Sequence, residues 1–576
     1  MQRRDFTVST ETLLREAKAH FDAGRFDDAL RLMHRAVSAE PNSPQLWSNC
    51  GTVLALMRHF EEAEESFSRA LALAPNFLSA LLNRAQARMQ LRRYEEAARD
   101  YDALLARAPD VPFARGALIR AKLQACDWHG LPEQWQHARQ DLHAGNPVLP
   151  AMVSTALCET PEDQLLASRI LANTRFPARV LWRDERYRHE RIRVAYVSAD
   201  FHAHATAVLT AGLFERHDKT RFETFAISFG PNDGGPMRRR LEGAFEHFVD
   251  VHGKSDAEIA QLLRNHEIDI AVDLKGYTDD SRPGIFAHRP APLQINYLGF
   301  PATMGAPYID YIIADAVTVP SELSACYSEK IVRLPHTYQP NDRTRERPET
   351  ILTRAEAGLP DDAFVFCCFN NVYKITPDMF GAWMRLLRDV PSSVLWLLED
   401  SDAAMRNLKR EATERGIAPD RLIFAKRLPP EAHLARHRLA DLFVDTAPYN
   451  AHTTASDALW MGLPLVTCAG RTFPSRVAAS LLHAIGLPEL VTHSLSEYEA
   501  LIVSLAREPQ RLAALKAKLE TNRETAPLFD TARYTRDLET AFVTIWERHQ
   551  RGEPPESFTI YENTAPPPPA AQAPPP

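Results

Sequence analysis

Hydrophobic and polar positions follow one pattern in the first part of the chain and another in the rest. Before about residue 110, apolar residues recur at helical spacing in blocks that end at Pro41, Pro75 and Pro109, so the pattern repeats every 34 residues. Each block carries an aromatic residue and, three positions later, an alanine: Phe26 and Ala29, Phe60 and Ala63, Tyr94 and Ala97. Small alanines let paired helices approach, and the aromatic rings fill the space between them. The pattern predicts three helix–turn–helix units over residues 8–110.

A period of 34 residues is that of tetratricopeptide repeats, which stack into an α-solenoid. Asn49 and Asn83 are also 34 residues apart, each on the first helix of its repeat. Asparagine amides offer both a donor and an acceptor, so a ladder of them can hold an extended acceptor protein or peptide by its backbone. The alternative is that both are ordinary solvated helix residues. Arg15 occupies the same phase in the first repeat, so the ladder is short.

Residues 111–185 keep a helical pattern but lose the period, so we expect degenerate helical repeats that join the solenoid to the C-terminal part of the chain. From about residue 190, apolar runs of strand length alternate with helical segments. Two such series, over residues 190–345 and 360–525, predict two Rossmann-like lobes, each a parallel sheet covered by helices. An amphipathic helix is expected over 526–550. The Pro- and Ala-rich tail, 553–576, is expected to be disordered and outside the fold.

Composition narrows the functional classes. The hydrophobic content of 45% and the charged content of 25% are globular values, and the net charge of −8 gives no support to binding of nucleic acid or a membrane surface. Seven cysteines without any CxxC spacing suggest neither a zinc site nor a disulfide framework, which favours a reducing, cytoplasmic location. No apolar run is long enough to span a bilayer.

The most informative stretch is residues 441–462, where an apolar strand ends in a turn and a helix begins at His452, Thr453 and Thr454, with Asp457 on its first turns. Free backbone N–H groups and the helix dipole favour phosphate at such a start, and the hydroxyls add donors. Taken alone, these residues are better explained as an ordinary N-cap. Asp457 is a candidate to accept hydrogen bonds from ribose hydroxyls.

Two other strand ends carry candidate chemistry. One strand runs into Asp200, His202 and His204, and another ends at Asn370 and Asn371, with Lys374 just beyond. A helix over 429–441 carries His433, Arg436 and His437. Lys374 and the 452–454 helix start can hold a diphosphate without a metal, because both supply positive potential as charge develops on a leaving group. Each residue alone also has a structural explanation, a surface lysine for Lys374 and a satisfied histidine for His204.

Several long motifs, in order, resemble the O-linked N-acetylglucosamine transferase family, including its bacterial and SPINDLY-like members. They are YVSADFHAH, FAHRPAPLQINYLGFPATMGAPYIDYIIAD, YSEKIVRLPHT, FNNVYKI, LADLFVDTAPYNAHTTASDALWMGLPLVT and SRVAASLL, and the resemblance covers roughly residues 12–545. It implies a GT-B fold of two Rossmann-like domains after the repeats. It also implies a metal-independent, inverting transfer of GlcNAc from UDP-GlcNAc to Ser or Thr of proteins, with no cofactor besides the donor sugar nucleotide.

The resemblance assigns roles by position. His204 matches an active-site histidine, and Lys374 matches the lysine that stabilises the leaving diphosphate. The residues that match donor-binding positions are the phosphate-contacting Asn371, the uracil-contacting His433 and Arg436, the diphosphate-binding His452, Thr453 and Thr454, the ribose-binding Asp457, and the sugar-pocket residues Gly299 and Pro301.

Three departures leave the donor open. Asn371 is shorter than the family's glutamine and is similar to the SPINDLY branch, which uses GDP-fucose. Tyr449 replaces a small residue near the N-acetyl group, and Pro430 stands where animal members have a phosphate-binding lysine, a place that Lys426 or Arg427 can take. The His-Thr-Thr triplet with Asp457 is closer to the UDP-GlcNAc branch, which we favour. The alternatives are a GDP-fucose-dependent protein O-fucosyltransferase, a non-catalytic tetratricopeptide scaffold, and a transferase acting on a small molecule or glycan.

Overall fold

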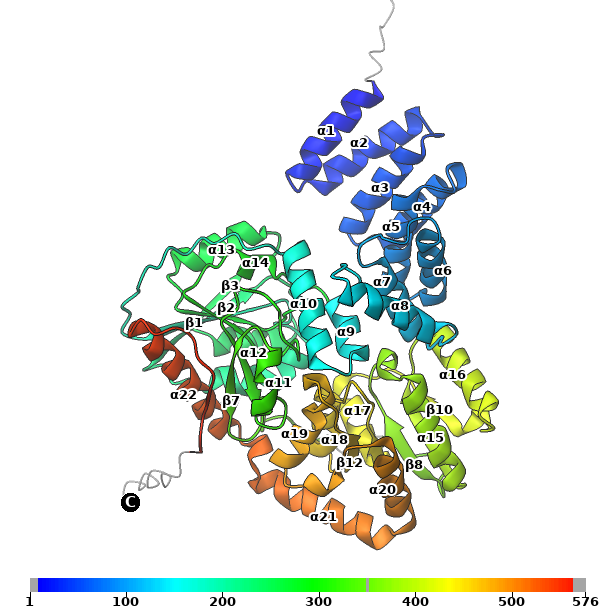
Figure 1. Ribbon diagram of the computed structural model, residues 1–576, viewed down its shortest axis with the longest axis vertical. Coiled ribbons are helices and arrows are strands. Elements are labelled where there is room, and N and C mark those ends of the chain that lie inside the picture. The colour runs from blue at the N-terminus through cyan, green and yellow to red at the C-terminus, as the bar shows by residue number, and fades with distance from the viewer. Residues whose placement is uncertain (1–8, 349–351, 563–576) are drawn as a thin grey trace, which may run out of the picture. The chain divides into compact units, whose positions relative to one another are not determined.

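The computed structural model describes residues 9–348 and 352–562 (Figure 1). The chain forms two compact units. The first comprises Met1–Leu157 and Leu352–Pro429, and the second comprises Cys158–Ile351 and Pro430–Pro576. Among the described residues, no helix is long and apolar enough to cross a membrane.

The first unit begins with the predicted repeats, which form successive helical hairpins, coloured blue in Figure 1. Ala29, Ala63 and Ala97 are fully buried, as expected for the positions where paired helices touch. Gly51 is a close approach, since a Cβ there would lie 2.8 Å from the ring of Phe67. The three repeats are α1 (Thr10–Asp22) with α2 (Phe26–Ala39), α3 (Pro44–Leu56) with α4 (Phe60–Leu73), and α5 (Leu78–Gln90) with α6 (Tyr94–Leu105).

The turn inside each hairpin has a left-handed residue at the same phase, Gly24, Arg58 or Arg92, with φ of 72°, 64° and 60°. Each turn closes with the same backbone hydrogen bond, for example Arg25 N–H to His20 O at 2.9 Å and His59 N–H to Leu54 O at 2.9 Å. The 34-residue period therefore reproduces the turn geometry as well as the helices. It does so even in the second and third repeats, where an arginine takes the left-handed conformation that glycine adopts most easily.

Further helices and three parallel strands complete the first unit. Cys126, just after α7, places Sγ 3.9 Å from the carbonyl oxygen of Val372, and the Trp128 ring packs on Phe380 at 5.3 Å. Asn407 donates from Nδ2 to Ala125 O at 2.9 Å. These contacts join the helical array to η2, α15 and α16, which lie between the strands in the chain. The elements are α7 (Ala114–Ala125), α8 (Leu131–His143), α9 (Ala151–Leu157), β8 (Phe364–Cys368), η2 (Val372–Lys374), α15 (Pro377–Asp389), β9 (Ser393–Leu398), α16 (Asp402–Glu414), η3 (Pro419–Arg421) and β10 (Leu422–Ala425).

The second unit contains an eight-stranded sheet in the order β14-β7-β6-β5-β4-β1-β2-β3, in which every pairing is parallel. Its central strands are buried on both faces, which explains their nearly continuous apolar runs. The strands are β1 (Ile192–Ser198), β2 (Phe222–Ser228), β3 (His247–Asp250), β4 (Ile270–Asp273), β5 (Leu293–Asn296), β6 (Tyr311–Asp315), β7 (Lys330–Leu334) and β14 (Phe558–Thr559). The accompanying helices are α10 (Pro161–Arg175), α11 (Ala205–Glu215), α12 (Pro236–Ala244), α13 (Asp256–Asn265), α14 (Gly284–Ala287) and η1 (Ser321–Cys326).

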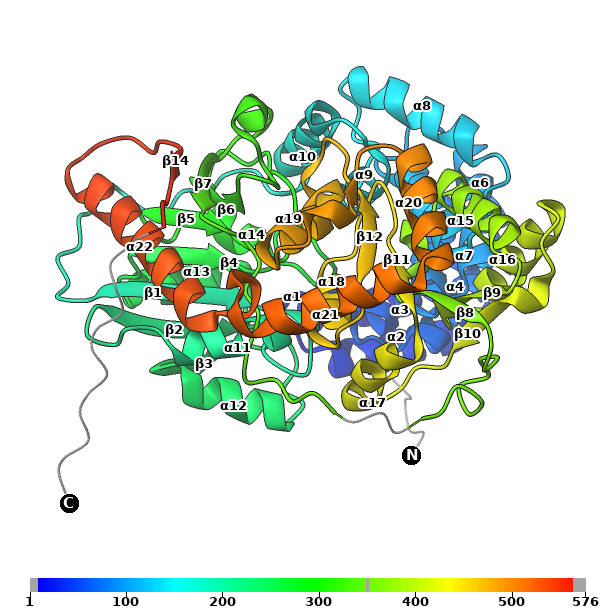
Figure 2. The same ribbon diagram turned by 90° about the horizontal axis from the view of Figure 1, so that it is seen from below.

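The C-terminal segment returns to this sheet. The long helix α22 (Thr531–Gln550) lies beside the eight-stranded sheet (Figure 2). Its Leu538, Phe542 and Ile545 belong to the buried core of that sheet. Beyond it, β14 pairs in parallel with β7, where Phe558 lies opposite Val332. The prediction of a disordered tail from residue 553 is therefore wrong for residues 553–562, because the exposed edge of β7 offers partners that a local composition rule cannot see. Residues 563–576 lie outside the described part.

The second unit also holds a second set of strands and helices. Gln339, which follows β7, donates from Nε2 to Ser456 Oγ on α18 at 2.7 Å. Ser480 Oγ on α19 donates to the carboxylate of Asp315, the last residue of β6, at 2.7 Å. These bonds connect α18 and α19 to the C-terminal ends of β7 and β6. The elements are α17 (Pro430–Ala435), η4 (Arg436–Leu439), β11 (Leu442–Val444), α18 (Thr453–Trp460), β12 (Leu465–Cys468), η5 (Phe473–Ser475), α19 (Val477–Ala484), η6 (Pro488–Leu490), β13 (Val491–Thr492), α20 (Leu495–Arg507), α21 (Pro509–Thr525) and η7 (Pro527–Phe529).

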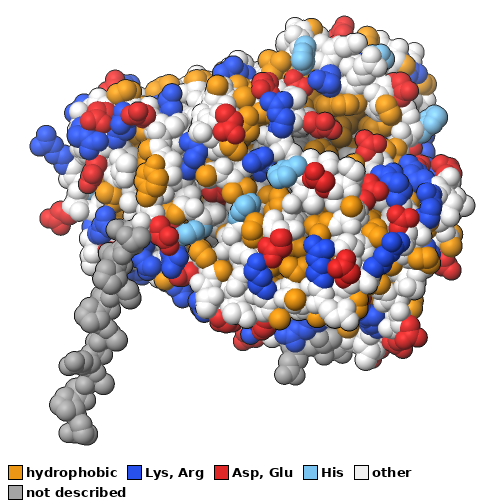
Figure 3. All heavy atoms as spheres, turned by 60° about the horizontal axis from the view of Figure 1, so that its bottom comes forward, with side chains coloured by type: hydrophobic (Ala, Val, Ile, Leu, Met, Phe, Trp, Pro, Cys, Tyr) orange, Lys and Arg blue, Asp and Glu red, His pale blue; other side chains and the backbone are white. Residues whose placement is uncertain are grey.

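Charge on the surface is mixed. On the face drawn in Figure 3, acidic and basic side chains lie among one another. Together with the net charge of −8, this gives no support to a nucleic-acid-binding surface on that face.

Candidate functional site

His204 caps helix α11 directly after the end of β1. Its Nδ1 accepts a hydrogen bond from Thr206 N–H at 3.2 Å and lies 3.4 Å from Oδ2 of Asp200. The His202 ring lies 5.8 Å away. Burial lowers the pKa of His204; the Asp200 carboxylate opposes this, while Lys275 and His202 lower the pKa further. The side chain is 40% exposed, so the ring can still reach a ligand.

Lys275, which follows β4, completes this cluster. Its Nζ donates to both carboxylate oxygens of Asp200, at 2.9 and 3.0 Å, and both side chains are buried. Strands β1 and β4 are hydrogen-bonded neighbours, so their carboxyl ends bring Asp200 and Lys275 together. Buried charges are stable only when they are paired, and this pair is bidentate. The strand ends in the sequence predicted Asp200 and His204 but not Lys275. Lys275 could have been found as a charged residue placed just after an apolar strand.

Gly299 and Pro301 form the turn after β5, which lies against the same strand ends. A Cβ on Gly299 would lie 2.0 Å from Leu274 O and 3.1 Å from the Cα of Lys275, so only glycine fits this approach. Pro301 is buried. The predicted sugar-pocket segment therefore adjoins the lysine of the Asp200–Lys275 pair.

The start of α18 is held by a buried carboxylate. Asp445 follows β11 and accepts from Thr446 N–H at 2.7 Å, Ala451 N–H at 2.6 Å and Thr467 Oγ1 at 2.6 Å. This network fixes the turn that delivers His452 to the N-cap position. The His452 side chain makes no capping hydrogen bond to the helix; instead its Nε2 lies 3.3 Å from Pro474 O and its ring lies 5.0 Å from that of Tyr449. The plain N-cap explanation is therefore not supported for His452.

Thr453 and Thr454 are the first two residues of α18 and are partly exposed, as an anion site at a helix start requires. Asp457, one turn later, forms an ion pair with Arg345 at 2.8 Å. Sequence reasoning missed Arg345, because it lies in a polar, Pro-containing stretch with no motif. The Asp457 carboxylate also acts on His437, whose pKa is lowered by burial and raised in part by Asp457.

His433 and Arg436 lie at α17 and η4, where Arg436 Nη2 contacts His433 Nδ1. The Arg436 side chain is buried, while His433 is partly exposed and packs edge-on against His437 at 5.4 Å between ring centroids. The structure thus brings these two predicted uracil-contacting residues together.

Lys374 and Asn371 belong to the first unit and flank the single turn η2. Asn371 is exposed at the start of the turn, and the Lys374 side chain is buried at its end, with Lys374 N–H donating to Asn371 O at 3.0 Å. A buried lysine at a strand end excludes the simple surface-lysine explanation. The contact of Cys126 with Val372 fixes this turn from the side of the helical array.

Asn49 and Asn83 lie on α3 and α5, the first helices of their repeats, as predicted. Asn49 accepts from Gln45 Nε2 at 2.8 Å, and Asn83 Nδ2 lies 3.5 Å from Thr52 Oγ1 on the neighbouring repeat. Both are partly exposed, which leaves the peptide-binding role a prediction.

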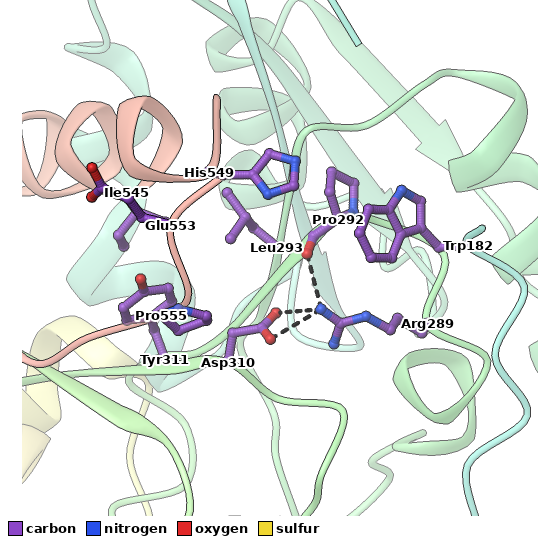
Figure 4. Close-up of a pocket in the computed structure, with 10 residues that line it drawn as sticks. All are labelled: Trp182, Arg289, Pro292, Leu293, Asp310, Tyr311, Ile545, His549, Glu553 and Pro555. Atoms are coloured by element: carbon purple, nitrogen blue, oxygen red, sulfur yellow. Dashed lines mark hydrogen bonds and ion pairs between the residues drawn. The ribbon is translucent and has the colours of Figure 1, made fainter. Parts of the chain in front are cut away.

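A cavity of about 210 Å³ lies elsewhere in the second unit, at the amino ends of β5 and β6 (Figure 4). Arg289 lines it, donating to Pro292 O at 3.0 Å and pairing with Asp310 at 3.0 Å, with its guanidinium over the Trp182 ring. The candidate site lies at the carboxyl ends of the strands. This cavity lies at their amino ends and is therefore not part of that site.

Comparison with known proteins places this arrangement in a class. Residues 170–347 and 343–538 match the model of glycosyl transferase family 41, and residues 14–76 and 51–112 match a tetratricopeptide-repeat model. The first match covers more than half of the chain, so the chain belongs to glycosyl transferase family 41.

Among its relatives, the chain is 39% identical over 380 residues to the probable UDP-N-acetylglucosamine–peptide N-acetylglucosaminyltransferase SEC of Arabidopsis thaliana, covering 65% of this chain and 39% of that protein. It is 32% identical over 486 residues to the UDP-N-acetylglucosamine–peptide N-acetylglucosaminyltransferase of Caenorhabditis elegans, covering 64% and 42%. It is 29% identical over 390 residues to the probable UDP-N-acetylglucosamine–peptide N-acetylglucosaminyltransferase SPINDLY of Solanum lycopersicum, covering 66% and 41%. The chain thus spans about 40% of the length of these curated relatives.

A solved structure agrees over nearly the whole chain. A mutant of the Thermobaculum terrenum O-GlcNAc transferase aligns with a TM-score of 0.73 and 25% identity, covering 96% of this chain and 100% of that one. The predicted fold class, tetratricopeptide repeats followed by two Rossmann-like lobes, is confirmed.

Proposed function

We propose that this chain is a metal-independent, inverting protein O-glycosyltransferase that transfers GlcNAc from UDP-GlcNAc to Ser and Thr hydroxyls. The observation that carries the proposal is the start of α18. There a family 41 chain presents partly exposed Thr453 and Thr454 beside His452, with Asp457 one turn further on. A helix start with two hydroxyls suits a diphosphate, and a carboxylate nearby suits ribose. The relatives named as UDP-N-acetylglucosamine–peptide transferases support this donor.

The reaction is a single displacement. The acceptor oxygen forms a bond to the anomeric carbon while the bond from that carbon to the diphosphate oxygen breaks, and UDP leaves with the bonding electron pair. The hydroxyl proton is released to solvent. Lys374 and the His452–Thr454 helix start stabilise the negative charge that develops on UDP, which is the largest catalytic contribution expected without a metal. His433 and Arg436 bind the uracil, Asn371 contacts phosphate, and Gly299, Pro301 and Tyr449 shape the sugar pocket.

The acceptor is a protein segment bound along the repeats in extended form, with Asn49 and Asn83 holding its backbone. A cytoplasmic location suits a nucleotide-sugar donor and the mostly buried cysteines, which are present as thiols in the described residues.

Isothermal titration tests the donor-binding part. We expect UDP to bind and GDP to bind much more weakly. A Thr453→Val/Thr454→Val double variant should weaken UDP binding about 10- to 100-fold, since hydrogen bonds to a charged group are worth roughly 1.5–3 kcal/mol. Thr413→Val, an exposed threonine on α16, serves as the control. An unchanged affinity in the double variant would contradict the diphosphate assignment.

A GDP-fucose donor is the second candidate, and it rests on Asn371, which is similar to the SPINDLY branch in the sequence resemblance. Tight binding of GDP without binding of UDP in the same titration selects it. Binding of neither nucleotide selects the non-catalytic scaffold.

A further inference from the structure

His204 is the most exposed member, at 40%, of a polar cluster that contains the buried pair Asp200 and Lys275. The cluster contains His204, Asp200, Lys275 and Thr206, all at the carboxyl ends of β1 and β4 or the start of α11. Its hydrogen-bond pattern constrains where the imidazole carries its proton.

Nδ1 of His204 accepts the backbone N–H of Thr206 at 3.2 Å. That N–H belongs to the first turn of α11 and has no intrahelical acceptor, so His204 is its cap. A nitrogen that accepts a hydrogen bond carries a lone pair and not a proton. In the neutral imidazole the proton then resides on Nε2.

The Asp200 carboxylate is the group that opposes this tautomer, because Oδ2 lies 3.4 Å from the same Nδ1. An unneutralised carboxylate there favours a protonated Nδ1. Lys275 binds both oxygens of Asp200, at 2.9 and 3.0 Å, and the Thr206 hydroxyl donates to Oδ2 at 3.4 Å. The charge and lone pairs of Asp200 are thus directed toward Lys275 rather than toward His204.

We propose that Lys275 is a positioning residue which, by neutralising Asp200, holds His204 as a neutral imidazole that donates a hydrogen bond from Nε2 to an oxygen of the bound substrate. In this form Nε2 holds its proton and is not the general base. The inference rests on the proposed function only for the identity of the substrate, since the tautomer is a property of the protein itself.

The charged groups facing His204 are Asp200, Lys275 and His202. Replacing Lys275 or Asp200 should therefore shift the protonation midpoint of His204 in opposite directions. Lys275→Met removes a positive charge and leaves Asp200 unpaired, so the protonation midpoint of His204 rises. Asp200→Asn removes the negative charge, so the midpoint falls. Lys275→Arg keeps the pairing and should stay near the wild type.

The test is nitrogen NMR of the full chain labelled with ¹⁵N-histidine, with His204 assigned by the signal lost in His204→Asn. We expect Nδ1 unprotonated and Nε2 protonated in the neutral ring. We also expect an upward midpoint shift in Lys275→Met and a downward shift in Asp200→Asn. If Lys275→Met does not fold, the midpoint of His204 in Asp200→Asn, compared with that in Lys275→Arg, still tests the inference. A protonated Nδ1, or a midpoint that ignores both charge changes, overturns the inference.

Kinetics add a readout that a merely structural role would not change. If Nε2 donates, His204→Gln retains about 10-fold more transfer than His204→Ala, because the glutamine amide can donate a hydrogen bond from a similar position. Equal loss in both variants overturns the donor role. A wild-type chain with no transferase activity but with the Nε2–H tautomer contradicts the proposed function alone. Normal transfer with a protonated Nδ1 contradicts the inference alone.

Discussion

Arg345 donates from Nη2 to Oδ1 of Asp457 at 2.8 Å, and the two side chains are only 15% and 14% exposed. Asp457 lies on the first turns of α18, whereas Arg345 lies on the segment that leaves β7, so the pair fixes the carboxylate relative to the helix start. The geometry agrees with a ribose-binding role, in which one oxygen is held by arginine and the other is left to accept from a hydroxyl.

Replacing Arg345 by methionine should weaken UDP binding about 10-fold, because the Asp457 carboxylate loses its orienting partner. Isothermal titration measures the affinity. Arg343→Met is the matched control, since Arg343 pairs at the exposed surface with Glu524 at 3.0 Å. If both variants bind UDP as the wild type does, the pair has no role in binding.

Lys374→Ala should lower kcat by roughly 100- to 1,000-fold while the chain stays folded, since the lysine is assigned to the developing charge on the leaving group. Lys409→Ala, an exposed lysine on α16 of the same unit, is the control. Steady-state transfer with each variant checks this. A Lys374→Ala enzyme within a few-fold of wild type would remove Lys374 from the mechanism.

Burial raises the pKa of the Asp273 carboxyl to about 6, although it accepts N–H bonds from Gly276 and Lys275 and faces the Lys275 charge. The folded state therefore binds this proton more tightly than the unfolded state. The stability from this group is present at acid pH and is lost as pH rises from about 4 through about 6, by roughly 2–3 kcal/mol.

Asp273→Asn should abolish that part of the pH dependence, because an amide does not titrate between pH 4 and pH 7. The amide oxygen can still accept both N–H bonds now made to Oδ1, so the local structure should be kept. Unfolding midpoints measured from pH 4 to pH 7 for the two proteins should diverge across this window. Parallel curves would show that Asp273 does not titrate there.

Gly24 has φ of 72° in the first repeat, and a Cβ added there would meet no atom within 4 Å. Gly24→Ala should therefore destabilise the α1–α2 hairpin by about 1 kcal/mol through backbone conformation alone. Gly243→Ala is the opposite case, since Gly243 sits in α12 with ordinary φ and open space and should gain about 0.5–1 kcal/mol. Hydrogen exchange of the two helical segments measures both changes, and a change of the same sign in both would refute this explanation.

Much of the fold follows from pattern in the sequence. The 34-residue period predicts α1 to α6, and the two series of apolar runs over residues 190–345 and 360–525 predict the parallel strands of the two Rossmann-like lobes. The short strands β3 and β14 are missed for a physical reason. Both lie at edges of the eight-stranded sheet, where a half-exposed HFVD or a two-residue Phe558–Thr559 carries no apolar run.

The candidate site is predictable to the extent that its residues follow strands. His204, Lys374 and the start of the His452–Thr454 triplet lie six to eight residues beyond strand ends, in the loops where ligands of parallel α/β proteins bind. Arg345 and Lys275 are not predicted, because their roles come from partners 112 and 75 positions away in the chain. The position of Lys275 just after an apolar strand is a local signal, but the long-range pairing itself is fixed by the fold and leaves none.

Donor identity is the central claim, and transfer itself tests it most directly. The full chain is incubated with cell lysate and either UDP-GlcNAc or GDP-fucose, each isotopically labelled, and modified peptides are identified by mass spectrometry, with Lys374→Ala as the inactive control. The account predicts labelled GlcNAc on Ser and Thr from UDP-GlcNAc, absent with Lys374→Ala. Labelled fucose from GDP-fucose without any GlcNAc transfer would contradict it.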